Sequence, residues 1–398
     1  MKEPINKHTK APGHILPTLV AAQWACTSLW FAINAVMPDL QRAFAWPIES
    51  VGMVTSALQL GFIVGTLLFA LLALADRFSA RRVFLICALC GASCTVAALF
   101  MVSDFDALLF WRFLTGFFLA GIYPVGMKIA AQWYPQGLGR ALGYLVGALV
   151  LGSASPHALR AISDNLPWQS LMWAVAALAA AGGALLFFAT PEPPVKAKRP
   201  ATLQWRALSS IVTDTQVRSS AWGYFGHMWE LYTLWVLLPV ILSQRLQGAA
   251  LSWATFVVLG SGALGCVLGG GLAQRWGSAK VAAWLLLISG MCCLLSPWAL
   301  GASDVWFAVW LLIWGITAAG DSPQFSALTA LNAPAQGMGS VLTLVNSLGF
   351  AISIVSIMWF VSQLPTVPLA QLLPWLAAGP ILGLLAMQPV LRGNKNHL

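Results

Sequence analysis

The sequence predicts an all-α integral membrane protein with twelve transmembrane helices in two parallel six-helix halves. Three observations predict this fold class. Of the 398 residues, 59% are hydrophobic and only 8% are charged, against about 25% charged residues in a soluble domain. The chain divides into long apolar runs close to the roughly 20 residues that a helix needs to cross a bilayer. Short motifs recur after about 200 residues. This composition excludes a water-soluble enzyme, a nucleic-acid-binding protein and any large domain outside the membrane.

The spans are cut at charges, prolines and glycines. We expect the first six near 15–36, 51–74, 83–102, 107–130, 139–161 and 168–189, and the second six near 219–243, 251–273, 281–301, 304–331, 338–362 and 367–390. The runs are continuous rather than alternating, which favours helices over a barrel. A basic segment with several prolines joins the two sets. We therefore expect an N-terminal half at 1–189, a linker at 190–218 and a C-terminal half at 219–398.

The basic residues predict the orientation. With the amino terminus inside, all but five of the 21 Lys and Arg lie on one side of the membrane, as cytoplasmic loops require. The exceptions are Arg42, Arg160 and Arg245 on the outer side, and Arg112 and Lys128 within the fourth span. We expect a multi-pass protein of the bacterial inner (plasma) membrane with both termini cytoplasmic. The net charge of +9 then encodes topology and not a nucleic-acid partner.

Three segments recur in the same order at equivalent places in the two halves. The pairs are 76–82 with 274–280 after spans two and eight, 120–124 with 319–323 in spans four and ten, and 136–139 with 336–339 after those spans. Chance could supply any one of these pairs. Together they indicate the duplication of a six-span unit. Because six is an even number, both copies have the same orientation and form parallel halves.

The loop after the second span resembles the signature of the major facilitator superfamily, Gly-x-x-x-Asp-Arg-x-Gly-Arg-Arg/Lys, although Leu72 and Ser79 replace its two glycines. The matching residues are Asp76, Arg77, Arg81 and Arg82, and in the duplicate Gly270, Arg275, Gly277 and Lys280, with Gln274 in place of the acid. In span four, Arg112 and Gly116 fit the Arg-x-x-x-Gly element of the family. The resemblance implies the fold of that superfamily and a gating role for these loop residues, whose contacts would hold the outward-open state. For Arg81 and Arg82 the alternative is a purely topogenic role.

Ionisable residues within the spans mark function by default, because insertion of each costs about 2.5–3.5 kcal/mol. They are Arg112, Lys128, His227, Glu230 and Asp321. Glu230 lies near the middle of span seven with His227 three residues earlier, hence on one helix face. Burial in an apolar cavity favours the neutral form of a carboxyl group. We expect Glu230, His227, Asp321 and Arg112 to carry proton coupling. The alternatives are helix-packing hydrogen bonds, carbonyl bonds from Arg112, and a snorkelling Lys128.

Two metal sites stay open as lesser alternatives, one at the His227–Glu230 pair and one at Cys87, Cys90 and Cys94 on one helix face. We predict no metal and no cofactor, with the cysteines reduced and buried. His157 and Arg160 follow a partial match to the span-five motif of drug/proton antiporters, which keeps the proline but lacks the Gly-Gly ending.

Aromatic and neutral polar residues of the spans that line the central cavity in the family are the candidates for substrate binding. They are Trp30, Asn34, Tyr123, Trp229, Tyr232 and Gln324. Their rings could hold a planar or cationic solute, and their polar groups could supply hydrogen bonds.

From the family resemblance we expect a secondary active transporter, not an enzyme, that moves a small organic solute by alternating access with protons as coupling ions. Its partners would be the solute, protons and the lipid bilayer, and we expect a monomer. The alternatives within the fold are a facilitated uniporter and an efflux antiporter. The alternatives from other classes are a non-transporting sensor and an intramembrane enzyme.

Overall fold

The computed structural model describes residues 11–134, 138–192, 204–334 and 336–393. The basic residues at 1–10, 193–203 and 394–398, which contribute to the predicted orientation, and the repeat residues 136–137 lie outside these ranges. Within them the chain is helical and contains no strand.

The described residues of the N-terminal half form nine helices. They are α1 (Ile15–Thr27), α2 (Ala32–Phe44), α3 (Ser50–Leu71), α4 (Leu74–Arg77), α5 (Ala80–Phe100), α6 (Phe105–Leu119), α7 (Tyr123–Trp133), α8 (Leu138–Ile162) and α9 (Trp168–Ala189). Two short helices follow, α10 (Trp205–Leu208) and α11 (Ser210–Thr213).

The C-terminal half repeats this plan. Its elements are α12 (Thr215–Ser243), α13 (Gly248–Trp276), α14 (Ser278–Leu294), α15 (Ser296–Gly301), α16 (Asp304–Gly320), α17 (Ser322–Asn332), α18 (Met338–Gln363), α19 (Leu369–Leu372), the 3₁₀ turn η1 (Leu373–Ala377), α20 (Ala378–Ala386) and α21 (Gln388–Gly393).

The all-α membrane fold is confirmed. Among the described residues, eleven helices or broken helices are long and apolar enough to cross a membrane, and the shorter apolar helix Ser278–Leu294 is continued by α15. These segments coincide with the twelve predicted spans. The largest difference is in the first span, which we expected to end near residue 36 but which continues as α2 to Phe44.

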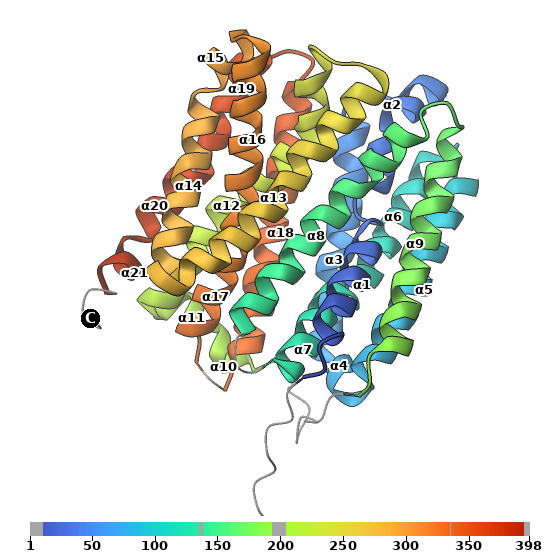
Figure 1. Ribbon diagram of the computed structural model, residues 1–398. Coiled ribbons are helices and arrows are strands. Elements are labelled where there is room, and N and C mark those ends of the chain that lie inside the picture. The colour runs from blue at the N-terminus through green and yellow to red at the C-terminus, as the bar shows by residue number, and fades with distance from the viewer. Residues whose placement is uncertain (1–10, 135–137, 193–203, 335, 394–398) are drawn as a thin grey trace, which may run out of the picture.

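The two halves lie side by side. Figure 1 shows α1–α9, in blue to green, on one side and α12–α21, in yellow to red, on the other, with α8 beside α13 at the junction. The second most extensive contact between the halves is α3 against α18. The start of α1, the linker helices and the end of α21 lie toward one end, the lower end in Figure 1. We call this the inner end and the opposite one the outer end.

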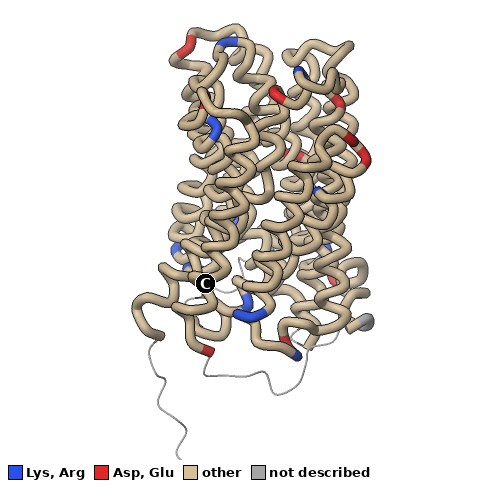
Figure 2. The backbone as a smooth tube through the Cα atoms, turned by 90° about the vertical axis from the view of Figure 1, so that its right-hand side faces the viewer, with Lys and Arg blue, Asp and Glu red and all other residues tan. Residues whose placement is uncertain are grey.

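The surface is suited to lipid. Large apolar side chains are exposed on the outside of the bundle, among them Leu264, Val355 and Phe110, each more than half exposed. A soluble protein rarely exposes so much contiguous apolar area. Most acidic and basic residues lie near the two ends of the bundle, and few lie between them (Figure 2).

Glycines lie at the closest helix contacts, and these contacts recur at equivalent places in the two halves. A Cβ atom at Gly116 of α6 would overlap the Leu58 carbonyl of α3, and one at Gly315 of α16 would overlap the Val258 carbonyl of α13. The two seams thus join equivalent spans in the two halves. Only glycine permits backbones to approach this closely.

Candidate functional site

The first span is interrupted in the middle of the bundle, where residues 28–31 separate α1 from α2. A break in a helix frees carbonyl groups, which in a membrane need donors from the protein itself. Arg112 of α6 supplies them, because its Nη1 donates to the Leu29 carbonyl at 3.1 Å and its Nη2 to the Trp30 carbonyl at 2.6 Å. The Arg112 side chain is fully buried. The contacts of this arginine are therefore to backbone carbonyls.

Four aromatic rings from four spans meet beside this break, and we call them the septum: Trp30, Phe62, Tyr232 and Phe350. Trp30 lies 5.0 Å from Phe62, 5.8 Å from Tyr232 and 5.6 Å from Phe350, measured between ring centroids. Phe62 and Phe350 are 4.8 Å apart. Trp30 and Phe62 belong to the N-terminal half and the other two to the C-terminal half, so the septum closes the space between the halves.

A polar layer lies on the outer side of the septum. Asn34 donates to Thr55 at 2.7 Å within the N-terminal half, and Thr233 donates to Ser356 at 2.8 Å within the C-terminal half. Ser353 of α18 donates to Gln59 of α3 at 3.0 Å, which links the two halves.

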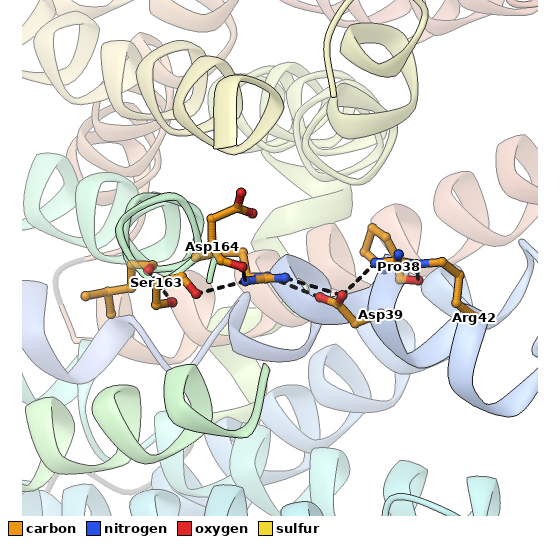
Figure 3. A network of polar contacts seen from close by, with 7 residues as sticks. Pro38, Asp39, Arg42, Ser163 and Asp164 are labelled. Atoms are coloured by element: carbon orange, nitrogen blue, oxygen red, sulfur yellow. Dashed lines mark hydrogen bonds and ion pairs between the residues drawn. The ribbon is translucent and has the colours of Figure 1, made fainter. Parts of the chain in front are cut away.

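Further outward, the halves are in direct contact. A Cβ atom at Gly52 of α3 would lie 3.4 Å from Val361 of α18. On the N-terminal half, Arg160 of α8 bonds both carboxylate oxygens of Asp39 and the Ser163 and Asp164 carbonyls, while Arg42 reaches the same carboxylate (Figure 3). The space between α3 and α18 is thus closed at its outer end.

A small chamber lies on the inner side of the septum. Its cavity measures about 30 Å³. Five aromatic residues line it, one of them from the N-terminal half, together with aliphatic side chains and a few small polar residues. The ring-bearing and polar members are Tyr123, Tyr224, Tyr232, Trp235, Phe350, Ser322, Ser326 and Asn346, with Met228 among the apolar ones.

A larger crevice of about 300 Å³ opens between the halves at the inner end. Its wall includes Thr66 of α3, Lys128 of α7 and Thr343 of α18. Pro124 lies in its wall and follows Tyr123 of the chamber directly. Gln204, just before α10, lines the mouth and donates through its backbone N–H to Ser340 at 2.8 Å. The bundle is therefore closed at the outer end and parted at the inner end.

Glu230 is buried inside the C-terminal half. One carboxylate oxygen accepts from the Trp314 indole at 2.6 Å and from the Cys293 thiol at 3.4 Å, and the other accepts from the Ser289 hydroxyl at 2.8 Å. These donors belong to α14 and α16 and lie outside the chamber wall. The carboxyl group thus ties three helices of one half together.

His227 and Asp321 form a second buried pair one turn nearer the inner end. His227 Nδ1 of α12 lies 2.7 Å from Asp321 Oδ1, and both side chains are almost completely buried. Asp321 occupies the break between α16 and α17, immediately before Ser322-Pro323, as the proline predicted. The His227 ring lies 5.7 Å from the Tyr224 ring, which forms part of the chamber wall.

Helical geometry explains why these acids lie behind the chamber. At 100° per residue, Glu230 is about 200° around α12 from Met228, which faces the chamber. Glu230 and His227 do share a face, as their spacing predicted, but it is the face toward α14, α16 and α17. The structure therefore places the titratable groups next to the chamber wall and not in it.

The predicted substrate residues occupy different places. Tyr123 and Tyr232 line the chamber, Trp30 lies in the septum, and Asn34 lies in the polar layer. The other two turn toward neighbouring helices. Trp229 packs on Gly379 of α20 and on the Phe360 ring, and Gln324 is buried facing α13 near Gly269.

Sequence reasoning missed Tyr224, Met228, Phe350, Asn346, Ser322 and Ser326. The first two could have been found, because residues 224, 228, 232 and 235 share one face of span seven. Residues of α18 and α17 carried no such signal, since nothing in their pattern distinguishes the chamber side.

The loop residues bond mainly within their own half. Asp76 pairs with Lys128, which also donates to the Ala75 carbonyl. Arg81 bonds Glu192 at 2.9 Å and reaches the Phe187 and Thr190 carbonyls at the end of α9. The side chains of Arg77, Arg82, Arg275 and Lys280 are exposed, and Gly270 has open space around its Cα hydrogens. The left-handed residue in this loop is Ala73, with φ of 48°, and not Leu72, where the motif predicted a glycine.

The remaining candidates are packing residues in this structure. His157 is buried in α8, and Arg160 forms the outer network of Figure 3. All seven cysteines are free thiols, and of the predicted trio only Cys90 is partly exposed. Across the described ranges, no three His, Cys, Asp or Glu side chains come together as a metal site.

Comparison with known proteins gives a consistent result. The sequence model of the Major Facilitator Superfamily matches residues 19–390. The inner membrane transport protein YdhP of Escherichia coli K12 is 24% identical over 294 residues, which is 72% of each chain. The 3-(3-hydroxy-phenyl)propionate transporter of the same strain is 27% identical over 302 residues, covering 73% of this chain and 72% of that one.

A chloramphenicol resistance protein of Streptomyces lividans is 26% identical over 243 residues, covering 56% of this chain and 61% of that one. Among solved structures, the human organic anion transporter MFSD10 (TETRAN) superposes with a TM-score of 0.73 at 17% identity. The superposition covers 95% of this chain and 100% of that one, and shows a shared fold.

Proposed function

This chain belongs to the major facilitator superfamily, and from that premise we propose that it is a proton-coupled secondary transporter of a small organic solute. Membership makes it a multi-pass membrane transporter and not an enzyme. The proton, the solute and the alternation between two open states are our proposal. The observation that carries it is the buried His227–Asp321 pair at the break of span ten, beside a chamber that both halves enclose.

The chamber supports alternating access. It lies between a closed outer end and an inner crevice of about 300 Å³, and its walls come from α7, α8, α12, α16, α17 and α18. Rocking of the halves about this point would open it to either side, as in other transporters with parallel repeats. Because one chain supplies both halves, we propose that a monomer suffices. We also propose that the inner end faces the cytoplasm, because the predicted excess of basic residues lies there.

The buried acids support proton coupling. Burial without a permanent counter-charge favours the neutral form of a carboxyl group, so a change in the surroundings can move a proton on or off it. Within the described part of the chain, Glu230 accepts hydrogen bonds from neutral donors alone. Asp321 lies 2.7 Å from His227, and both side chains are almost completely buried. The names of the relatives in Escherichia coli and Streptomyces support a small organic solute.

Transport by proteoliposomes tests the proposal. Uptake of 3-(3-hydroxyphenyl)propionate and of chloramphenicol is measured with and without an imposed gradient of one pH unit, in both directions, and uptake by protein-free liposomes is subtracted because a weak acid redistributes passively across a pH gradient. If one proton is coupled to each solute, that gradient supports about tenfold accumulation, since tenfold corresponds to about 1.4 kcal/mol. Equilibration without accumulation in either direction would identify a uniporter, and binding without any flux would identify a sensor.

The Glu230→Gln variant tests the role of the acid. It preserves shape and a carbonyl oxygen for the Trp314 indole, so we expect a folded protein that equilibrates solute but no longer accumulates it. Glu49→Gln at the outer end of α3 is the matched control and should accumulate solute normally. Unchanged accumulation by Glu230→Gln would remove Glu230 from the coupling mechanism, and the same comparison with Asp321→Asn tests the second acid.

A further inference from the structure

We propose that the solute is an uncharged aromatic compound carrying a hydroxyl or amide group. This inference rests on the proposed transport function and names the substrate class of the chamber. It follows from three properties of the chamber: its rings, its neutral polar groups, and the position of the nearby charged side chains outside the described residues of its wall.

The rings come from both halves and leave flat surfaces on facing helices. Tyr123 of α7 belongs to the N-terminal half, and Tyr224, Tyr232 and Phe350 belong to the C-terminal half. Offset and edge-to-face contacts between rings are favourable and directional. A planar aromatic solute can therefore replace the contacts that Tyr232 and Phe350 make with Trp30 of the other half when the halves move apart, whereas a sugar or a branched aliphatic solute cannot.

The polar members of the wall are neutral. Ser322 and Ser326 lie on α17 and Asn346 on α18, and Asn346 is only partly buried. A hydroxyl group can both donate and accept, and an amide offers two donors and one acceptor oxygen. A solute that carries such groups can satisfy them without bringing a charge into the chamber.

The cations near the centre are not available to an anion. Arg112 is committed to the carbonyls of Leu29 and Trp30, and its side chain is fully buried. Lys128 is committed to Asp76 and the Ala75 carbonyl, and it lines the inner crevice. His227 faces Asp321. A carboxylate in the chamber would lose its hydration without gaining a counter-charge, which is strongly unfavourable.

The two buried acids are likewise not available to a cationic solute in the chamber. Glu230 accepts three hydrogen bonds from α14 and α16 on the far side of α12. Asp321 lies behind Ser322 and beside His227, and it is not part of the chamber wall. Aromatic faces attract cations to some degree, but no carboxylate of the wall would complete the site.

The chamber is contracted in this conformation. A cavity of about 30 Å³ holds roughly one water molecule. A solute must therefore enter as the rings separate, and the inner crevice gives a route that begins at Pro124, next to Tyr123.

Three compounds with one skeleton test the charge preference. Binding of 3-(3-hydroxyphenyl)propionate, its amide and the corresponding propylamine to the purified full-length protein is measured by isothermal titration calorimetry at pH 7.5, where the first is an anion and the third a cation. We expect the amide to bind about tenfold more tightly than either charged compound. Equal or tighter binding of a charged member, or no binding of the amide, overturns the inference. If the propionate is nevertheless accumulated by proteoliposomes in a pH gradient, the proposed function stands and only the substrate class is wrong.

A charge placed in the wall tests the site itself. Asn346→Asp is nearly isosteric and puts a carboxylate in the chamber, so it should tighten binding of the amine and weaken binding of the propionate, each by about tenfold. Asn165→Asp in the exposed outer loop is the matched control and should leave the order of the three compounds unchanged. If Asn346→Asp also leaves the order unchanged while the protein stays folded, the solute does not bind in this chamber.

Discussion

At the scale of single residues, the buried and partly buried basic side chains of this membrane protein bond backbone carbonyls as well as carboxylates. Arg112 bonds two carbonyls, and Lys128 and Arg81 each combine one carboxylate with backbone carbonyls. Hydrogen bonds of ionised donors are about twice as strong as neutral ones. A basic side chain can therefore stabilise a break in a helix that the lipid would otherwise not tolerate.

Replacing Arg112 tests this role. Arg112→Met leaves the Leu29 and Trp30 carbonyls buried without donors, so we expect a loss of about 3 kcal/mol in stability. The measurement is the thermal unfolding transition of the purified protein in detergent. Arg42→Met is the matched control, because 76% of the Arg42 side chain is exposed and its pair with Asp39 should contribute under about 1 kcal/mol. Equal losses of stability for the two variants would show that the bonds to the carbonyls stabilise the protein no more than an exposed ion pair does.

One residue in the loop after α3 has a strained backbone conformation, which a substitution by glycine should relieve. Ala73 has φ of 48°, a left-handed conformation that costs a residue with a Cβ atom about 1–2 kcal/mol. Ala73→Gly should therefore raise the unfolding temperature. In the α5 helix, Ala97→Gly should lower it, because glycine costs about 1 kcal/mol in a helix interior. A fall with both variants would contradict the assigned strain.

At the scale of elements, the sequence predicted the extents of most spans. It predicted the helix break in span ten but not the one in span one. Ser322-Pro323 predicted the break of span ten because proline cannot continue a helical hydrogen-bond ladder. The break at 28–31 in span one contains neither glycine nor proline, and its carbonyls are bonded by Arg112 from another span. Tertiary contacts of this kind leave no signal in the local sequence. The sequence therefore predicted neither this break nor the continuation of span one to Phe44.

The same limit applies to the candidate site. Spacing alone placed His227 and Glu230 on one face of span seven, but it could not say which neighbours that face meets. The ring-rich face at 224, 228 and 232 turned out to line the chamber. In a helix that is buried on all sides, hydrophobic periodicity no longer separates core from cavity.

Glycine seams between α3 and α6 and between α13 and α16 give a prediction at this scale. Gly116→Ala and Gly315→Ala should each destabilise the protein by about 2 kcal/mol, because the added methyl group overlaps a backbone carbonyl that cannot move alone. Gly271→Ala in α13 has open space around the new methyl group and should stabilise by about 0.5–1 kcal/mol. Unfolding temperatures of the three variants decide, and a stabilising Gly116→Ala would show that the helices can separate freely.

At the scale of the whole molecule, the proposed alternation between two open states would depend on contacts that cross between the halves. The septum, the Gln59–Ser353 bond and the packing of Gly52 on Val361 close the outer end, whereas the inner end has a crevice. A ligand or a mutation shifts such an equilibrium only by the difference between its effects on the two states. Weakening the outer contacts alone should therefore open the outer end and close the inner one.

Trp30→Ala makes that change, because Trp30 touches two rings of the other half. Reporter cysteines at Val361 in the outer contact and at Thr343 in the inner crevice are labelled with a water-soluble maleimide, with rates corrected for the native cysteines of the same protein without the reporter. In the Trp30→Ala background we expect labelling at 361 to become about tenfold faster, equivalent to about 1.4 kcal/mol, and labelling at 343 to become slower. Trp173→Ala, at a half-exposed position on the lipid face, should change neither rate. Faster labelling at both positions would indicate loosening of the fold and not rocking of the halves, and would contradict the assignment of the septum as the outer gate.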